Sequence, residues 1–201
     1  MSTSANNSSS IIKKGVDYAW GHPSGAAIAA KGYSFCCRYL SNTPSKNIDL
    51  VELNDLHANS LSVVLIWETS SRRPTEGKQA GIDDATKAKA QALALGADPI
   101  RLVLYFACDW DFSELDVPNV NAYFAGVCEV LPVSQVGVYG SFFIVKELLD
   151  AKLATYAWQT SAWSENQWDS RCNIKQVSYN VSINKVSCDI NEACTDDFGQ
   201  W

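Results

Sequence analysis

Apolar runs of strand length alternate along most of the chain with segments whose apolar residues recur at helical spacing. This alternation is typical of βα units, in which consecutive strands lie parallel. The first five strands are predicted at residues 12–20, 33–40, 61–67, 101–108 and 135–139. The helices are predicted at residues 24–31, 49–59, 76–96, 117–131 and 142–152. Continuous apolar character predicts that these strands are buried on both faces.

The helix predictions rest on end signals as well as on periodicity. Pro23 and Ser24 suit the start of the first helix, where a serine side chain can cap free backbone N–H groups. Asp49 followed by Glu52 predicts a capping box at the second helix, and Gly96 suits the end of the Ala-rich third helix.

The pattern changes after Ala154. Three short apolar runs, residues 155–160, 174–179 and 185–190, leave little room for helices between them. The sequence therefore predicts a single α/β domain over residues 11–201, a TIM-like (β/α)8 barrel that is irregular in its last third. Residues 1–10 are rich in Ser and Asn and are predicted to form a disordered leader.

Composition narrows the class of protein and of partner. The 201 residues are 47% apolar and 19% charged, as in a soluble globular protein, and the net charge of −6 argues against nucleic acid as a partner. No apolar run approaches the roughly 20 residues of a membrane helix, so no membrane partner is expected, and the chain is expected to be a monomer. The leader lacks the apolar block of a signal peptide, which leaves phage-assisted release, non-classical export and an intracellular role all open.

Neither a metal site nor a cofactor is expected. His22 and His57 have no neighbours at ligand spacing, and His57 is predicted to lie on a helix surface. The cysteine count is odd, at seven, and Cys36 and Cys37 are adjacent, so free thiols are expected. The alternative is one disulfide among Cys172, Cys188 and Cys194.

Polar residues gather where the predicted strands end. In a closed parallel barrel the carboxyl ends of all strands meet at one mouth, so these residues are expected to converge. Each residue alone is also compatible with a loop charge or a helix cap. The set comprises Asp17, Arg38, Glu68, Asp109, Asp111, Tyr139, Gln159, Gln176 and Asp189.

The strongest element is the apolar run 105–108, which leads directly into Asp109 and Asp111. If the strand continues that far, its period of two puts both carboxyl groups on one side. Crowded carboxylates repel each other, so the pKa of one rises and it can hold a proton while the other stays ionised. Glycosidic cleavage uses such a pair. The alternative is a set of calcium ligands or solvated loop acids, although no Asp/Asn/Gly loop signature follows.

Seven motifs together resemble the glycoside hydrolase-like barrels once grouped as the domain of unknown function DUF1906, which are similar to the family 25 lysozymes. The resemblance spans nearly the whole chain from Gly15 onward. It implies a modified (β/α) barrel that cleaves bacterial peptidoglycan between its amino sugars. The motifs are GVDYAW at residues 15–20, CRYL at 37–40, IWET at 66–69, YFACDWD at 105–111, GVYG at 137–140, WQT at 158–160 and CD at 188–189.

The resemblance also implies catalytic roles. Asp17, Asp109 and Asp189 match three acidic positions of the lysozymes, and Asp111 stands where those enzymes have a glutamate proton donor. Asp111 is thereby implied to be the general acid, with Asp109 stabilising charge or orienting the 2-acetamido group. An aspartate is one methylene shorter than a glutamate, and such a displacement can be costly to rate. Glu68 is therefore the alternative donor.

Substrate-binding residues are predicted beside these acids. Arg38 is expected to pair with a mouth carboxylate and keep it ionised, and Tyr139 and Gln176 to line the mouth. Trp20, Trp67, Trp110 and Trp158 are expected either to stack on sugar rings or to pack in the core below.

Two functions of different classes follow from the sequence. The first is a glycosidase that cleaves peptidoglycan as lysozymes do, or, less expectedly, another glycan. The second is a barrel that binds cell-wall carbohydrate without turnover.

Overall fold

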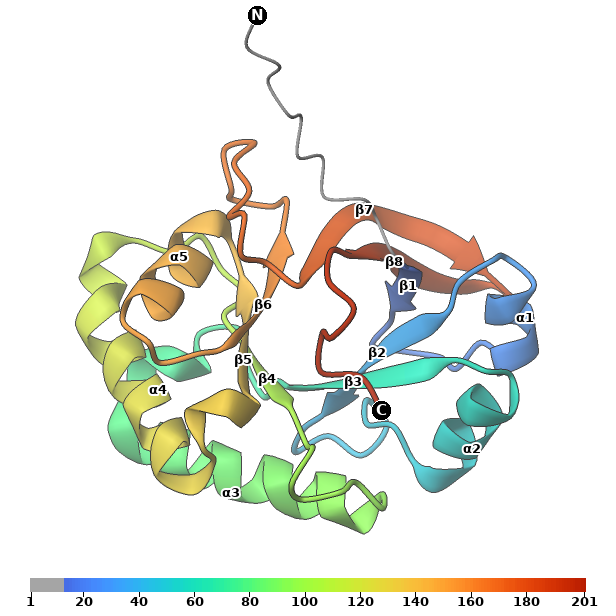
Figure 1. Cartoon of the computed structure of the whole chain (residues 1–201), viewed down its shortest axis with the longest axis horizontal. Coiled ribbons are helices and arrows are strands. Elements are labelled where there is room, and N and C mark those ends of the chain that lie inside the picture. Colours follow the sequence, from blue (N-terminus) through green and yellow to red (C-terminus); the bar gives the residue numbers. More distant parts are fainter. Residues whose placement is uncertain (1–12) are drawn as a thin grey trace, which may run out of the picture.

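The computed structural model describes residues 13–201, which form a closed barrel of eight strands (Figure 1). The predicted leader lies outside the described residues. The strands are β1 (Lys13–Asp17), β2 (Phe35–Leu40), β3 (Ser62–Trp67), β4 (Leu104–Ala107), β5 (Val136–Gly140), β6 (Tyr156–Thr160), β7 (Ile174–Ile183) and β8 (Val186–Ala193). The helices are α1 (Gly25–Ala29), α2 (Leu50–Ala58), α3 (Lys78–Ala94), α4 (Val117–Val130) and α5 (Phe142–Asp150), with short 3-10 helices at Arg73–Glu76, Glu114–Asp116 and Val133–Gln135.

The strands follow one another around the barrel in chain order. Neighbours from β1 to β7 are parallel, whereas β8 is antiparallel to both β7 and β1. The predicted barrel and its irregular last third are thus confirmed. Asn184 and Lys185 link β7 to β8 with positive φ angles of 50° and 68°, the backbone that a tight hairpin requires.

The reversed direction of β8 is an exception to the expectation that every strand ends at the mouth. The carboxyl ends of β1 to β7 share one face, but β8 begins at that face and runs away from it. Asp189, predicted at the trailing end of the last strand, instead lies in the first half of β8, where it pairs in register with Asp17. It reaches the mouth because its strand is inverted.

Side chains alternate between the inside of the barrel and the helix layer outside. Phe35, Cys37 and Tyr105 belong to the inner cluster, whereas Cys36 and Phe106 belong to the outer one. Figure 1 shows α1 and α2 on one side of the barrel and α3, α4 and α5 on the other. The interior is a packed core at this level, which leaves only its two ends for a site.

Glycines make room for the aromatic rings of this interior. A Cβ added to Gly15 would lie 2.5 Å from the Phe35 ring, and one added to Gly137 would lie 2.5 Å from the Tyr105 ring. A side chain at either position would force these rings to move, so the two glycines are needed for packing.

The C-terminal segment closes the base of the barrel, at the opposite end from the mouth. Phe198 is fully buried, with its ring centroid 4.8 Å from that of Phe35, and the Tyr105 hydroxyl donates a hydrogen bond to its carbonyl. Trp201 exchanges backbone hydrogen bonds with Val63, so the chain ends beside β3 (Figure 1). Among the described residues, this segment covers the base of the barrel, and the mouth is the end left open.

Several predicted boundaries need correction. Strand 101–108 shortens to β4, and helix 76–96 divides at Gly77, whose φ is 81°, into a 3-10 helix and α3. Asp49 caps α2 by accepting from the Glu52 backbone N–H, but the Glu52 carboxylate turns to the barrel wall, so only half of the predicted capping box forms. All seven cysteines are free thiols. Among the described residues, no helix has the length and apolar character needed to cross a bilayer.

Candidate active site at the barrel mouth

Asp17 ends β1 with its side chain inside the barrel and only 4% exposed. Its Oδ2 accepts hydrogen bonds from Gln176 Nε2 at 2.9 Å and Asn191 Nδ2 at 2.7 Å. The Tyr139 hydroxyl donates to Gln176 Oε1, and Trp158 Nε1 donates to Asn191 Oδ1. These outer bonds orient both amides with their NH2 groups toward Asp17.

Burial raises the pKa of Asp17 from 3.8 to about 7. The two amide donors and the more distant Arg38 favour the ionised form and Asp189 disfavours it, but desolvation is the largest effect. Because both amides donate to Oδ2, Oδ1 is the oxygen better placed to carry a proton. Asp17 can therefore gain and lose a proton near neutral pH.

Asp189 lies directly opposite Asp17 on the neighbouring antiparallel strand, so the two side chains share a face. Both line a hollow of about 220 Å³ whose wall also includes Tyr39 and the exposed Trp20. Burial raises the pKa of Asp189, and a hydrogen bond from the Asn180 backbone N–H opposes that rise. Two acids therefore line this hollow.

Asp109 follows β4 by two residues and is half-buried. Burial raises its pKa, the negative charges of Glu68 and Asp189 add to the rise, and Lys46 opposes it. Lys46 Nζ forms an ion pair with Glu68 Oε2 at 2.5 Å. Asp109, Glu68 and Asp189 are therefore close enough to influence one another.

Tyr39 lies among these charges. Lys46 Nζ is 4.1 Å from the centre of its ring, and burial raises the pKa of its hydroxyl well above the ordinary value, with further contributions from Asp17, Glu68 and Asp109. The predicted residues Asp17, Glu68, Asp109, Tyr139, Gln176 and Asp189 thus gather at one mouth around Tyr39.

Asp111 is placed elsewhere. It is exposed and lines a second hollow of about 440 Å³ with Phe112, Phe143, Trp163 and Glu165. Because β4 ends at Ala107, strand alternation does not extend to Asp111, and the predicted side-by-side pair with Asp109 is wrong. The charges that shift the pKa of Asp109 are those of Glu68, Lys46 and Asp189.

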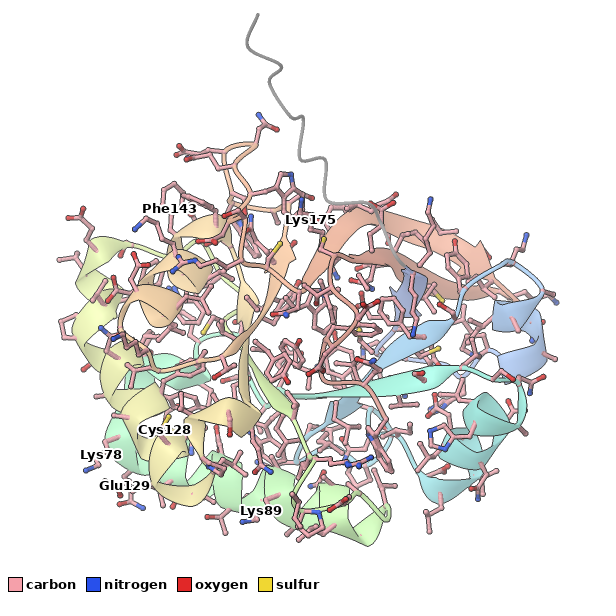
Figure 2. The ribbon with its side chains drawn as sticks, in the orientation of Figure 1. Lys78, Lys89, Cys128, Glu129, Phe143 and Lys175 are labelled. Atoms are coloured by element: carbon pink, nitrogen blue, oxygen red, sulfur yellow. The ribbon has the colours of Figure 1, made fainter. Side chains whose placement is uncertain are left out.

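The loop after β6 forms one wall of this second hollow and holds Trp163 in place. Trp163 is 41% exposed and has a φ of 53°, an uncommon conformation for a bulky residue. The buried Ser164 hydroxyl accepts from the Phe142 N–H and donates to the Thr160 carbonyl. Phe143, at the start of α5, faces the same hollow and is labelled in Figure 2. The mouth therefore has an aromatic region beside its acidic one.

The predicted tryptophans divide into exposed and buried. Trp20 is 59% exposed beside the acids, whereas Trp67 and Trp158 are 1% exposed and Trp110 is 6% exposed. Trp110 Nε1 donates to Asp116 Oδ2. The stacking prediction is wrong for the three buried residues, because packing covers their faces. Trp158 contributes indirectly, through Asn191.

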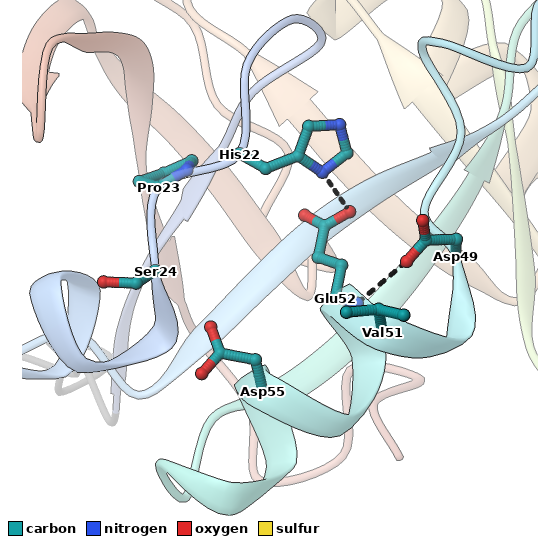
Figure 3. Close-up of a pocket in the computed structure, with 7 residues that line it drawn as sticks. All are labelled: His22, Pro23, Ser24, Asp49, Val51, Glu52 and Asp55. Atoms are coloured by element: carbon teal, nitrogen blue, oxygen red, sulfur yellow. Dashed lines mark hydrogen bonds and ion pairs between the residues drawn. The ribbon is translucent and has the colours of Figure 1, made fainter.

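Arg38 points out of the barrel and is fully buried under α2. Its Nε donates to Glu52 Oε1 at 2.6 Å, and the Tyr18 hydroxyl donates to the same oxygen. Figure 3 shows the third partner of Glu52, His22, whose Nδ1 lies 2.6 Å from Oε2. The expected pairing with a mouth carboxylate is therefore wrong. Arg38 instead anchors the segment from Tyr18 to His22, which carries Trp20.

Sequence reasoning missed Tyr39, Lys46, Glu52, Asn191 and Trp163. Strand alternation was an available signal for two of them. Counting in twos from the inward Cys37 places Tyr39 inside and Arg38 outside, and counting from Asp189 places Asn191 inside. Among residues 13–201, no three His, Cys, Asp or Glu side chains group as a metal site requires.

The comparisons with known proteins identify the family. Residues 26–194 match the family model described as Rv2525c-like, glycoside hydrolase-like domain. No curated protein matches the chain in sequence.

Solved structures of several proteins share the fold, including the following three. The Tat-secreted protein Rv2525c of Mycobacterium tuberculosis is 24% identical, with a TM-score of 0.89 over 94% of this chain and 99% of that one. A family 25 glycosyl hydrolase of Bacillus anthracis is 14% identical, with a TM-score of 0.58 over 92% and 90%. The catalytic domain of endolysin ply40, from bacteriophage P40 of Listeria monocytogenes, is 15% identical, with a TM-score of 0.56 over 94% and 96%.

Proposed function

Because the chain belongs to the Rv2525c-like family of glycoside hydrolase-like domains, we propose that its barrel mouth hydrolyses a bacterial cell-wall glycan, as lysozymes do. The observation that carries the proposal is the trio Asp17, Asp109 and Asp189, whose pKa values are all raised by burial at one mouth. Burial and repulsion between neighbouring acids both favour the protonated form, and the pKa of Asp17 rises to about 7. A mouth that brings such acids together supplies the pair of carboxyl groups that glycosidic cleavage uses.

Asp109 is the proposed general acid. It is partly exposed, so it can reach a glycosidic oxygen, and Glu68 and Asp189 favour its protonated form. Asp189, also partly exposed, is the proposed charge stabiliser or water activator. Asp17 is too buried to touch a sugar, and its proposed role is to set the charge beside Asp189.

The two hollows support a polymeric substrate. Trp20 lies beside the acids, and Trp163 and Phe143 line the hollow at the ends of β4 and β6. Exposed aromatic faces stack on the apolar faces of sugar rings. A glycan chain that lies across the mouth would contact both regions, which favours an internal position of cleavage. A cell-wall substrate also implies action outside the cytoplasm, in keeping with the Tat-secreted Rv2525c.

Glycan binding without turnover is the second candidate, and one observation favours it. Asp111, at the position that resembles the lysozymes' donor, lies in the second hollow, and Glu68, the other donor considered, is paired with Lys46. Under this candidate the mouth holds the glycan but lacks a donor at the lysozyme position.

Purified peptidoglycan sacculi test both candidates. We expect the wild-type protein to release reducing ends, Asp109→Asn to lower the initial rate by about 10²- to 10⁴-fold, and Asp111→Asn to stay within about tenfold of wild type. Circular dichroism checks that each variant is folded. Equal rates for wild type and Asp109→Asn would reject the assignment. Wild-type protein that co-sediments with sacculi but releases no product, and loses co-sedimentation in Trp20→Ala, would establish the binding function instead.

A further inference from the structure

Two of the seven thiols, Cys172 and Cys194, are neighbours at the end of the β7–β8 ladder. Ile174 pairs with Ala193, and the Cys194 N–H donates to the Asn173 carbonyl at 2.8 Å, so Cys194 lies opposite the residue that follows Cys172. Both cysteine side chains belong to the layer outside the barrel. Cys172 is 2% exposed, whereas Cys194 is partly exposed. The two thiols are close enough to share a hydrogen bond, so they lie within the reach of a disulfide.

The surroundings make the two thiols unequal. A hydrogen bond from the Cys172 thiol lowers the pKa of Cys194. Lys175, which lies two residues along the ladder on the same outer face, lowers it further, whereas burial and the charge of Glu192 oppose the fall. The same hydrogen bond and burial raise the pKa of Cys172. Lys175 is labelled in Figure 2. Cys194 is thus the more accessible and more readily ionised thiol, and Cys172 is the covered thiol beside it.

The other thiols lack this combination. Burial raises the pKa of Cys36, Cys37, Cys108 and Cys188, and those four are all buried. Cys128 is partly exposed like Cys194, and the sulfur of each donates to a backbone carbonyl, but burial raises the pKa of Cys128. Cys128 therefore serves as a matched control.

We propose that Cys172 and Cys194 are a redox-active pair that forms an intramolecular disulfide on reaction with a small disulfide such as oxidised glutathione. The Cys194 thiolate attacks one glutathione sulfur, forms a mixed disulfide and releases one glutathione thiolate. Cys172 then gives up its proton, attacks the Cys194 sulfur and releases the second glutathione. The protein loses two electrons and two protons, and oxidised glutathione becomes two molecules of reduced glutathione.

The bond would act on the base of the barrel and leave the mouth unchanged. It joins the β6–β7 connection to the start of the C-terminal segment, whose Phe198 is buried beside Phe35. Asp189 and Asn191 lie on the inner face of β8, opposite to the face of Cys194. A crosslink there restricts the unfolded chain, so oxidation is expected to raise the melting temperature by about 4–10 °C. This inference does not depend on the proposed glycosidase activity.

Mass spectrometry of the full chain treated with oxidised glutathione tests the pair. We expect one internal disulfide, mapped to Cys172 and Cys194 by peptide analysis, together with a higher melting temperature that dithiothreitol reverses. Cys172→Ser should stop at a mixed glutathione disulfide on Cys194. Cys194→Ser should form neither product, and Cys128→Ser should behave as wild type.

A second measurement needs no variant. A brief pulse of iodoacetamide on the reduced wild-type protein near pH 7 should label Cys194 before any other cysteine. Labelling of Cys128 first, a disulfide mapped to another pair, or no disulfide in the wild-type protein would each overturn the proposal.

Discussion

Two buried carboxylates lie on opposite faces of the barrel wall and have different partners. Glu52, outside the barrel, is bound by the Arg38 guanidinium, the Tyr18 hydroxyl and the His22 imidazole. Asp17, inside the barrel, accepts hydrogen bonds from two neutral amides. Their exposed fractions are similar, at 8% and 4%. Burial alone therefore does not distinguish them.

The difference lies in how the cost of desolvating a negative charge is offset. A guanidinium supplies a full opposite charge with two aligned donors, so Glu52 works as a structural ion-pair partner. Amide dipoles offset only part of that cost, and the pKa of Asp17 rises to about 7. The paired carboxylate holds a loop in place, whereas the unpaired one is able to exchange a proton.

The largest expected effect concerns Asp17→Asn. A folded-state pKa of about 7, against 3.8 in the unfolded chain, means that the folded protein binds the proton more tightly. The stability that this proton provides is complete below pH 4 and is lost as the pH rises to 7, a change of roughly 4 kcal/mol. The asparagine side chain of the variant cannot ionise. The free energy of unfolding of the variant should therefore rise relative to that of wild type as the pH increases from 4 to 7.

Urea denaturation of both proteins at a series of pH values measures the gain. Because the other titrating groups are common to the two proteins, the difference curve reports the titration of Asp17 together with the change that its charge makes to its neighbour Asp189. Parallel curves between pH 4 and 7 would contradict a raised pKa at this residue.

Glu52→Gln tests the other carboxylate. Loss of its charge leaves Arg38 buried and unpaired, which typically costs 3–5 kcal/mol, and we expect about 3 kcal/mol because the amide oxygen can still accept a hydrogen bond. Urea denaturation at pH 7 measures the loss. Glu192→Gln is the control, since its pairing with the exposed Lys14 should contribute less than about 1 kcal/mol. Equal losses in the two variants would mean that the Arg38 pair is no stronger than a surface pair.

The fold was predictable because alternating apolar runs specify strands and helices locally. The direction of β8 was not, since a period of two looks the same in a parallel and an antiparallel strand. The deciding feature is the two-residue link Asn184–Lys185, and the predicted strand 174–179 stopped four residues short of it. A strand prediction extended to Ile183 would have left a link to the last strand so short that only an antiparallel hairpin could form.

The site was predictable as far as strand ends define it. Asp17, Glu68 and Asp109 follow from that rule, whereas Arg38 and Trp67 fail because a shift of one residue puts a side chain on the other face of the wall. The partners of the buried charges lie off the strands. Glu52 on α2 and Lys46 in the loop before α2 contact the barrel only once the helix packs, so strand pattern alone could not identify them.

Lys46→Gln is expected to have the smallest effect. It tests whether the charges at the mouth shift the pKa values of neighbouring acids. Lys46 lowers the pKa of Asp109 and also pairs with Glu68. Its removal takes away a favourable charge and leaves that of Glu68 uncompensated, so both changes raise the pKa of Asp109. Carbon-13 NMR titration of the aspartate carboxyl groups should show a rise of up to about one pH unit. Lys14→Gln, on the outer face, should leave the Asp109 titration unchanged. An equally unchanged titration in Lys46→Gln would show that Asp109 is not coupled to the Lys46–Glu68 pair.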